Sequence, residues 1–276
     1  AVLFVDSGTT IAGDVVDGGD GTDILSVTAA AANAQTAVTT ISGIEELTIS
    51  DALATGGITV ANYQAGINTV NLGLGGIGEI TFEAGANTVN LVAPLTAGTL
   101  ALTDTGTATT DSVTIVNEDA GDNAFADRTI TSTGFETVNL VTTGLATAAA
   151  ANTATAQGIG AVTVTVDTGG TAVVNVSGTN IANMNGTVTA HTLNFSGLTA
   201  QAAGTATADM TGQAFEYVGA AATSGTITGS AGDDVLLGDA DESTNIDGGA
   251  GDDTITGGSA AETISGGAGD DTINGA

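Results

Sequence analysis

The sequence lacks most of the residues on which covalent cross-links and anionic partners depend. It contains no cysteine, no lysine and a single arginine, Arg128, against 31 Asp and Glu residues, so its formal net charge is -30. Without cysteine, neither a disulfide scaffold nor a thiolate zinc site can form. Because phosphate binding requires Lys or Arg, this balance excludes nucleic acid as a partner and argues against an anionic membrane surface.

Aromatic residues and long apolar runs are also scarce. Hydrophobic residues make up 42% of the chain and aromatic residues only 3%, which favours thin layers of small β-branched side chains over a compact aromatic core. No stretch approaches the roughly 20 apolar residues of a spanning helix, so we expect no membrane insertion. The first residues lack a basic region, and Gly275 and Ala276 resemble the start of another repeat, so we interpret the chain as part of a larger protein.

Nine-residue repeats of the form G-G-x-G-x-D-x-U-x, in which U is a large apolar residue, dominate the C-terminal region. Strong copies occupy residues 229–237, 248–256 and 266–274, and weaker copies occupy residues 238–246 and 257–265. The strong copies are complete except that Ser230 replaces the second glycine of the first. A further complete copy lies at residues 18–26, and a degenerate one at residues 106–114. Repeats of this length are typical of stacked coils.

The chemistry of the repeat predicts a tight loop followed by a short strand. Glycines at positions 1, 2 and 4 permit positive φ and close backbone approach, and the aspartate at position 6 closes the loop. The apolar residue at position 8 points into a thin core. Two copies form one coil of about 18 residues, and coils stack about 4.8 Å apart. Strong loops should therefore share one edge of the stack, with Glu262 on the opposite edge.

That alignment stacks Asp234, Asp253 and Asp271, which are 19 and 18 residues apart. At about 5 Å and an effective dielectric constant near 20, each adjacent pair of carboxylates repels by roughly 3 kcal/mol. A hard divalent cation removes this repulsion, and all-oxygen ligands favour Ca²⁺ over Mg²⁺. Ordinary acidic turns would explain one such loop, but three in phase with apolar spacers favour calcium.

The region from residue 27 to 228 has a different texture, in which apolar residues alternate with Thr and Asn. We expect half-buried strands at residues 69–72, 88–91, 113–116, 137–140, 162–166, 173–176 and 192–195. Their spacing predicts one strand per coil of an irregular parallel β-helix, and a β-sandwich is the alternative. The expected fold is therefore all-β, an elongated right-handed parallel β-helix over residues 1–228 that continues into a β-roll over residues 229–276. The Ala-rich stretches at residues 29–37 and 145–157 fit loops or short helices equally well.

The nonapeptide units resemble those of RTX proteins, which are calcium-binding secreted proteins of Gram-negative bacteria. The Thr/Ala/Val-rich strands and the phrases at residues 43–49 and 134–140 are similar to Caulobacter-type RTX surface-layer (S-layer) proteins. This resemblance implies type I secretion, a calcium-bound parallel β-roll, and self-association into a two-dimensional lattice on the cell surface. It also implies attachment to a cell-surface glycan or lipopolysaccharide through a region outside this chain.

The resemblance also implies a set of calcium ligands. It assigns side-chain oxygens to Asp234, Asp253 and Asp271, and carbonyl oxygens to Gly229, Ala231, Gly248, Gly249, Ala250, Gly251, Gly267 and Gly269. Asp23 occupies the same motif position in the N-terminal copy. We hypothesise that Glu45 completes its site, and that Asp111 and Glu136 form an equivalent pair. The acidic stretch around Asp119 and Asp122 is a further candidate, with a solvated turn as the alternative.

Several features argue against an enzyme. The only histidine, His191, lies at the start of a predicted strand, and no cysteine is available as a nucleophile. Carboxylate pairs suited to glycoside hydrolysis are numerous, but the repeat already explains them as ligands. We therefore expect an extracellular structural protein, with an RTX adhesin or the calcium-folding module of a secreted hydrolase as the alternatives.

Overall fold

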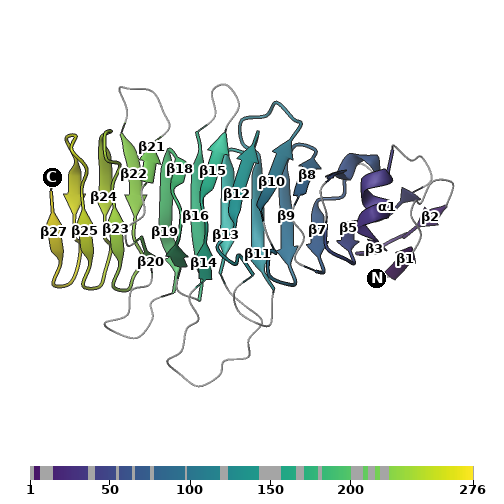
Figure 1. Cartoon of the computed structure of the whole chain (residues 1–276), viewed down its shortest axis with the longest axis horizontal. Helices are drawn as coiled ribbons and strands as arrows, with labels where there is room; N and C mark the ends of the chain where they lie inside the picture. The colour runs from purple at the N-terminus through teal and green to yellow at the C-terminus, as the bar shows by residue number, and fades with distance from the viewer. Residues whose placement is uncertain are drawn as a thin grey trace, which may run out of the picture.

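The computed structural model describes residues 3–6, 15–36, 41–53, 56–63, 66–74, 78–96, 98–118, 124–142, 157–165, 171–179, 182–199, 208–210, 215–217 and 224–275. The molecule is an elongated rod in which short strands lie across the long axis like rungs (Figure 1). The N- and C-terminal ends of the chain lie at opposite ends of this rod. The chain therefore advances along one axis as it coils.

One parallel sheet, which we call the long sheet, runs the length of the rod. Its strands, in spatial order, are β1 (Leu3–Asp6), β3 (Ile24–Val27), β5 (Glu46–Ile49), β7 (Thr69–Leu72), β9 (Ala86–Leu91), β11 (Ser112–Asn117), β13 (Thr137–Val141), β16 (Val173–Gly178), β19 (Thr192–Leu198), β22 (Gly225–Thr228), β24 (Thr244–Asp247) and β26 (Thr263–Ser265). Spatial order follows chain order, as a solenoid requires. The ladder also continues across residues 228 and 229, because β22 pairs with both β19 and β24.

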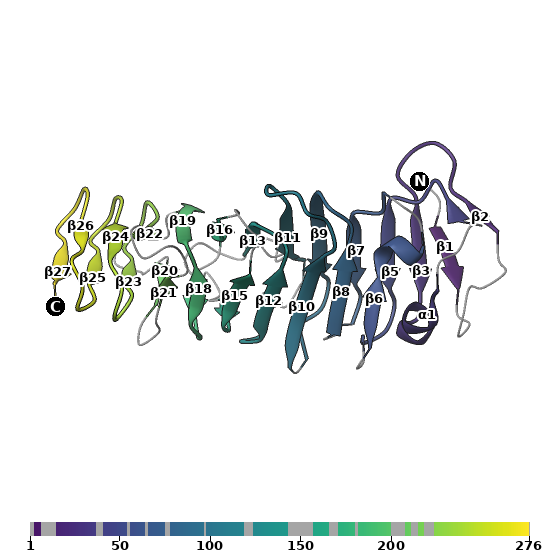
Figure 2. The ribbon, with the colours of Figure 1, turned by 90° about the horizontal axis from the view of Figure 1, so that it is seen from above.

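Two shorter parallel sheets face the long sheet. The middle sheet consists of β6 (Gly57–Thr59), β8 (Gly78–Phe82), β10 (Thr99–Asp104), β12 (Thr129–Thr133), β15 (Val162–Thr165), β18 (Val188–Ala190) and β21 (Phe215–Tyr217). The C-terminal sheet consists of β14 (Gln157–Ile159), β17 (Ala182–Met184), β20 (Ala208–Asp209), β23 (Val235–Leu237), β25 (Thr254–Thr256) and β27 (Thr272–Asn274). Seen from above, the strands form two rows along the rod (Figure 2).

Three small elements complete the described structure at the N-terminal end. They are the two-stranded ribbon β2 (Val16–Asp17) and β4 (Ile41–Ser42), the helix α1 (Ala29–Ala34) and the 3₁₀ helix η1 (Val60–Asn62). The Thr28 side chain caps α1 by accepting a hydrogen bond from the Ala31 N–H at 3.2 Å. No helix within the described ranges is long and apolar enough to cross a membrane.

Side-chain alternation explains why these segments form strands. In β13, Val138 and Leu140 point inward and are buried, whereas Thr137, Asn139 and Val141 are half-buried on the outer face. Outward asparagines stack in register. Asn175 donates to Asn139 at 2.9 Å, and Asn194 donates to Asn175 at 3.1 Å. The coils of β13, β16 and β19 thus extend both an apolar row inside and an amide row outside.

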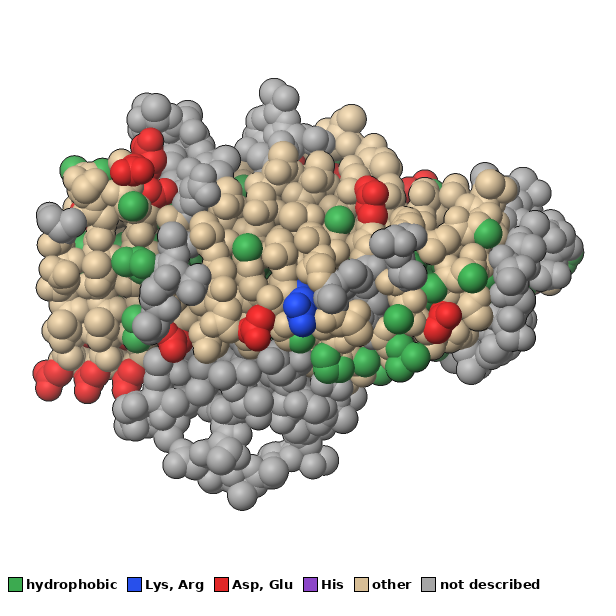
Figure 3. Space-filling view, in the orientation of Figure 1, with side chains coloured by type: hydrophobic (Ala, Val, Ile, Leu, Met, Phe, Trp, Pro, Cys, Tyr) green, Lys and Arg blue, Asp and Glu red, His purple; other side chains and the backbone are tan. Residues whose placement is uncertain are grey.

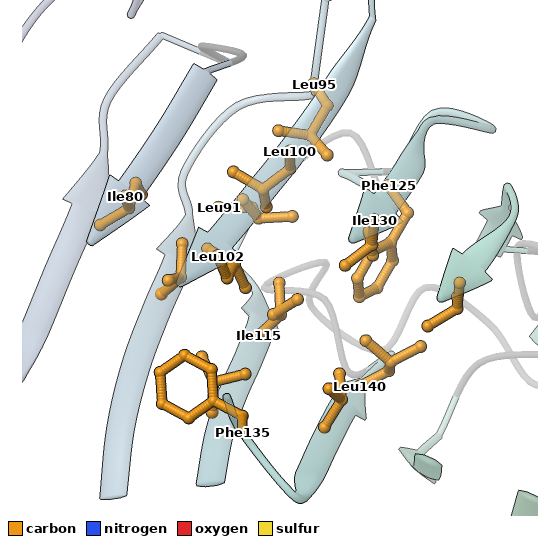
Figure 4. Close-up of a cluster of buried hydrophobic side chains, with 14 of the residues drawn as sticks. Ile80, Leu91, Leu95, Leu100, Leu102, Ile115, Phe125, Ile130, Phe135 and Leu140 are labelled. Atoms are coloured by element: carbon orange, nitrogen blue, oxygen red, sulfur yellow. The ribbon is translucent and has the colours of Figure 1, made fainter. Parts of the chain in front are cut away.

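The core lies between the two rows of strands. Leu91, Ile115 and Leu140 from the long sheet meet Ile80, Leu100, Leu102 and Ile130 from the middle sheet (Figure 4). Phenylalanines fill the corners, and Phe82 and Phe135 make an edge-to-face contact with ring centroids 6.1 Å apart. The layered core of aliphatic side chains matches the composition. Most of the few aromatic side chains are nevertheless buried in this core.

The structure confirms the all-β parallel architecture and excludes the β-sandwich, because every described strand pair is parallel. The prediction of one strand per coil was wrong, since most coils contribute a second strand to a facing sheet. The segment predicted at residues 162–166 forms β15 over Val162–Thr165, but it lies in the middle sheet rather than beside the others. Alternation alone identifies a strand and not its sheet. Of the Ala-rich stretches, the first contains α1, whereas nearly all of the second lies outside the described residues.

Candidate metal centre

The three strong loops lie at one corner of the C-terminal coils. We call this the exit corner, because there the chain leaves the long sheet for the C-terminal sheet. Residues 229–234 connect β22 to β23, residues 248–253 connect β24 to β25, and residues 266–271 connect β26 to β27. Acidic side chains line the edges of this end of the rod (Figure 3). The predicted common edge is therefore present.

The aspartate at position 6 of each loop reaches back to the preceding coil. Asp253 Oδ1 accepts the Asp234 N–H at 2.9 Å, and Asp271 Oδ1 accepts the Asp253 N–H at 3.1 Å. Asp234 Oδ1 accepts the Ala208 N–H at 2.8 Å in the same way. Each aspartate directly precedes a strand of the C-terminal sheet, so strand register places the carboxylates one above another. The structure thus brings together the three residues that the sequence aligned.

The first position of each strong loop requires glycine because neighbouring atoms lie too close to leave room for a Cβ. Its φ angle does not require glycine. A Cβ at Gly248 would overlap both Asp253 Oδ2 and the carbonyl oxygen of Gly266 in the next coil. A Cβ at Gly229 would overlap the Gly248 carbonyl oxygen in the same manner. Positions 2 and 4 need positive φ instead, with +101° at Gly249 and +120° at Gly251. Glycine at the first position therefore keeps a side-chain carbon away from the Asp253 carboxylate and the Gly266 carbonyl oxygen.

Ser230, which breaks the glycine pattern, changes the first loop. Its hydroxyl donates to the Asp234 carboxylate, and its N–H donates to Asp234 Oδ2 at 2.6 Å. Donors within the protein thus supply hydrogen bonds to both oxygens of the Asp234 carboxylate. By contrast, Asp253 Oδ2 is buried and meets no hydrogen-bond donor among the residues that the structure describes. In the sequence, Ser230 is only a mismatch to the repeat. The carboxylate that most needs a cation is that of Asp253.

The buried carboxylates have no compensating charge. Asp253 is 1% exposed; burial raises its pKa to about 6, and the charges of Asp234 and Asp271 contribute, although its hydrogen bond with the Asp234 N–H opposes them. Burial also raises the pKa of Asp234, against the hydrogen bonds from Ser230 and Ala208. The chain has no lysine and only Arg128 to neutralise its acids. The orphaned Asp253 oxygen and the oxygen-only surroundings fit Ca²⁺, which supplies positive charge when bound.

Calcium at this corner would need backbone oxygens as well. In the described ranges, no three acidic or histidine side chains gather into a group that could hold a metal ion. The predicted carbonyl ligands do lie in the strong loops, and Ala250 forms a parallel bridge with Ala268 of the next coil. The ligand roles of Gly229, Ala231, Gly248, Gly249, Ala250, Gly251, Gly267 and Gly269 stay predictions.

A second row of carboxylates was not identified from the sequence. Asp252 N–H donates to Asp233 Oδ1 at 3.0 Å, and Asp270 N–H donates to Asp252 Oδ1 at 2.8 Å. Asp252 and Asp270 are exposed. This outer row repeats the backbone hydrogen bonds of the inner row, which consists of Asp234, Asp253 and Asp271. The pair of adjacent aspartates in each strong loop is the only feature of the sequence that indicates it.

The predicted pairs outside the nonapeptide region are also brought together, but at a different corner. The Asp23 N–H donates to Glu45 Oε2 at 2.8 Å, and the Asp111 N–H donates to Glu136 Oε2 at 2.9 Å. All four residues lie at the entry corner, where the chain joins the long sheet. Asp23 therefore matches Asp234 in motif position but lies on the opposite edge, together with Glu262. The same motif can serve either corner because both corners begin a strand.

Two further predicted ligands, Asp119 and Asp122, lie outside the described residues. An aspartate that was not predicted as a ligand shows a contrasting arrangement. Asp239, in the first weak loop, closes its own turn by accepting the N–H groups of Asp241 at 2.8 Å and Glu242 at 3.0 Å. Asp239 thus illustrates ordinary turn chemistry, whereas Asp253 bridges coils.

Comparison with known proteins supports the calcium interpretation for the C-terminal coils. Residues 226–244 and 241–273 match the RTX calcium-binding nonapeptide repeat. No curated protein and no solved structure matches the chain. These repeats bind Ca²⁺ and typically occur in secreted proteins, so the C-terminal coils carry the marks of a secreted calcium-binding protein.

Proposed function

We propose, on the premise that residues 226–273 are RTX calcium-binding repeats, that the chain is an extracellular structural protein of a Gram-negative bacterial surface layer. In this proposal the protein leaves the cell by type I secretion, and calcium drives both folding and assembly into a two-dimensional lattice. The observation that carries the proposal is the uninterrupted long sheet. It runs the length of an elongated rod, and rows of outward side chains stack in register across its strands.

The outer face of the long sheet suits repeated contacts between copies. Asn139, Asn175 and Asn194 occupy equivalent outward positions in successive strands, and their amides already form a hydrogen-bonded row. Thr228, the exposed Asp247 and Ser265 occupy the corresponding positions nearer the C-terminal end. A neighbouring rod can therefore meet a regular polar surface at many points, which is the requirement for a lattice.

Charge makes such assembly dependent on a divalent cation. Copies with a net charge of -30 repel one another. The exposed Asp252 and Asp270 add to that repulsion at the C-terminal end. Extracellular modules bind calcium with dissociation constants of about 10⁻⁴ to 10⁻³ M, so the sites would fill outside the cell and stay empty inside it. Scarcity of intracellular calcium would keep the chain competent for export.

A catalytic role has less support. His191 lies directly before β19, where its Nδ1 is 3.2 Å from the Thr192 hydroxyl oxygen. The buried carboxylates serve as bridges between coils rather than facing one another across a cleft. We therefore propose a structural role, with attachment to a surface glycan or lipopolysaccharide through a region outside this chain.

Electron microscopy of the purified chain tests the proposal directly. With millimolar calcium, ordered two-dimensional sheets are expected, and excess chelator should dissolve them. Isolated rods at every calcium concentration would contradict the lattice and favour an adhesin. Asp252→Asn combined with Asp270→Asn should lower the calcium concentration at which sheets form, because it removes exposed negative charge without touching the inner row. A Glu79→Gln/Glu83→Gln variant removes the same charge from the middle region and serves as the control.

A further inference from the structure

We propose that Asp111 and Glu136 bind a calcium ion at the entry corner, outside the C-terminal nonapeptide repeats. Asp111 directly precedes β11 and Glu136 directly precedes β13. These strands are neighbours in the long sheet, with Ser112 paired to Thr137. The two acids, 25 residues apart in the chain, thus occupy the same position in successive coils. The inference rests on the calcium dependence in the proposed function and is independent of lattice assembly.

Backbone hydrogen bonds give this pair the same geometry as the nonapeptide aspartates. Glu136 Oε2 accepts the Asp111 N–H at 2.9 Å, and Asp111 Oδ1 accepts the Gly85 N–H at 2.7 Å. Each acid therefore reaches back one coil, as Asp253 reaches Asp234 and Asp234 reaches Ala208. The Asp111 carbonyl accepts the Glu136 and Thr137 N–H groups at 3.0 and 3.1 Å, which locks the two coils together. The arrangement therefore repeats the carboxylate-to-backbone bridges of the C-terminal repeats, with Asp111 from the degenerate copy at residues 106–114 and Glu136 from a segment that lacks the repeat.

One oxygen of each carboxylate remains without a donor. Asp111 is 3% exposed and Glu136 is 4% exposed. Asp111 Oδ2 and Glu136 Oε1 are buried. Neither atom accepts a hydrogen bond from any donor in the described part of the chain, and Arg128 is no exception. The same feature marks Asp253 in the matched repeats. Buried carboxylate oxygens without donors are unfavourable unless a cation balances them.

The donor set selects the cation. Both free atoms are carboxylate oxygens, and hard oxygen ligands at a backbone-rich corner suit Ca²⁺. The nearby Asp104 is also buried, but it accepts the Gly106 N–H at 2.9 Å and thereby closes the turn after β10. With two carboxylates, the remaining ligands would be backbone oxygens and water, as in a nonapeptide site.

Calcium stoichiometry of the full chain tests this assignment. Isothermal titration calorimetry of the Asp111→Asn/Glu136→Gln variant should show one calcium fewer per chain than the parent. The Glu79→Gln/Glu83→Gln variant removes the same charge from exposed positions in neighbouring coils and should bind as many ions as the parent. Loss of calcium by both variants would indicate a general charge effect and overturn the site. Equal stoichiometry in the first variant and the parent would also overturn it.

A second measurement covers the case in which the first variant does not fold. Crystals of the unmodified chain grown with terbium, a calcium substitute, should show an anomalous peak between Asp111 Oδ2 and Glu136 Oε1. Peaks at the nonapeptide loops and none at the entry corner would overturn the inference while leaving the proposed function intact. Absence of peaks at the nonapeptide loops would instead contradict the calcium dependence of the proposed function.

Discussion

The C-terminal coils and the middle coils are built on one ladder but differ in what stabilises them. Middle strands such as β9, β10 and β11 contain six residues each, and Phe82, Phe125 and Phe135 are buried between them. Strands β23, β25 and β27 contain three residues each, and residues 229–276 contain no aromatic residue. The same C-terminal segment contains 11 of the 31 acidic residues. Hydrophobic burial is therefore available to the middle coils, whereas we expect the C-terminal coils to depend on a cation.

Calcium removal should separate the two regions most strongly. In excess chelator, we expect the amides of Asp234 and Asp253 to exchange with solvent at least a hundredfold faster, because a ligand at about 100 times its dissociation constant stabilises the fold by about 2.7 kcal/mol. The amides of β9, β11 and β13 should change far less. Hydrogen exchange read by mass spectrometry measures both. Equal loss of protection along the rod would show one cooperative unit and remove the distinction.

A core truncation should produce the opposite pattern. Phe135→Ala removes a fully buried ring and its contact with Phe82, so it should destabilise the middle coils by about 3–5 kcal/mol. Thermal unfolding at saturating calcium measures this loss. The calcium midpoint of the C-terminal coils should stay where it is in the parent. A large shift of that midpoint would mean that the two regions are coupled through the long sheet.

Acidification should partly replace calcium in the C-terminal coils. The folded-state pKa of Asp253 is raised from 3.8 to about 6, so the metal-free fold is favoured by protonation. Its stabilising contribution is full below pH 3.8 and is lost as the pH rises through about 6. In chelator, protection of the Asp253 amide should therefore increase as the pH falls from 7 to 4.5, after correction for intrinsic exchange. With calcium present, the calcium midpoint should rise over the same range, because protons compete for the carboxylate.

Two conservative substitutions should distinguish an aspartate that bridges two coils from one that closes its own turn within the C-terminal coils. Asp253→Asn removes the charge of a residue that spans two coils, and it should raise the calcium midpoint about tenfold, since affinity follows the charge of the ligands. Asp239→Asn alters a residue that closes its own turn, and it should raise the midpoint less than twofold. Circular dichroism during calcium titration measures both. Matching midpoints would contradict the bridging role of Asp253.

Local patterns in the chain were sufficient for much of this structure. Alternation of apolar and polar residues identified the long-sheet strand at residues 69–72 at its described bounds, and the one at residues 137–140 one residue short of the described end. Period-two burial is a property of each strand alone. The nonapeptide phase likewise placed Asp234, Asp253 and Asp271 in one row, since equal spacing returns the chain to the same corner in each coil. The repeated order of acid and strand also paired Asp111 with Glu136.

Other features emerged only when the coils were stacked. Val162–Thr165 (β15) has the same alternation as β16, yet it belongs to the middle sheet and not to the long sheet. The direction in which a loop turns depends on contacts between coils. Asp23 and Asp234 share a motif position but lie at opposite corners for the same reason. The roles of Ser230 and of the outer aspartate row depend on backbone N–H groups one coil away. Sequence spacing therefore determined which residues recur, whereas stacking decided which face they occupy and which oxygens remain without a donor.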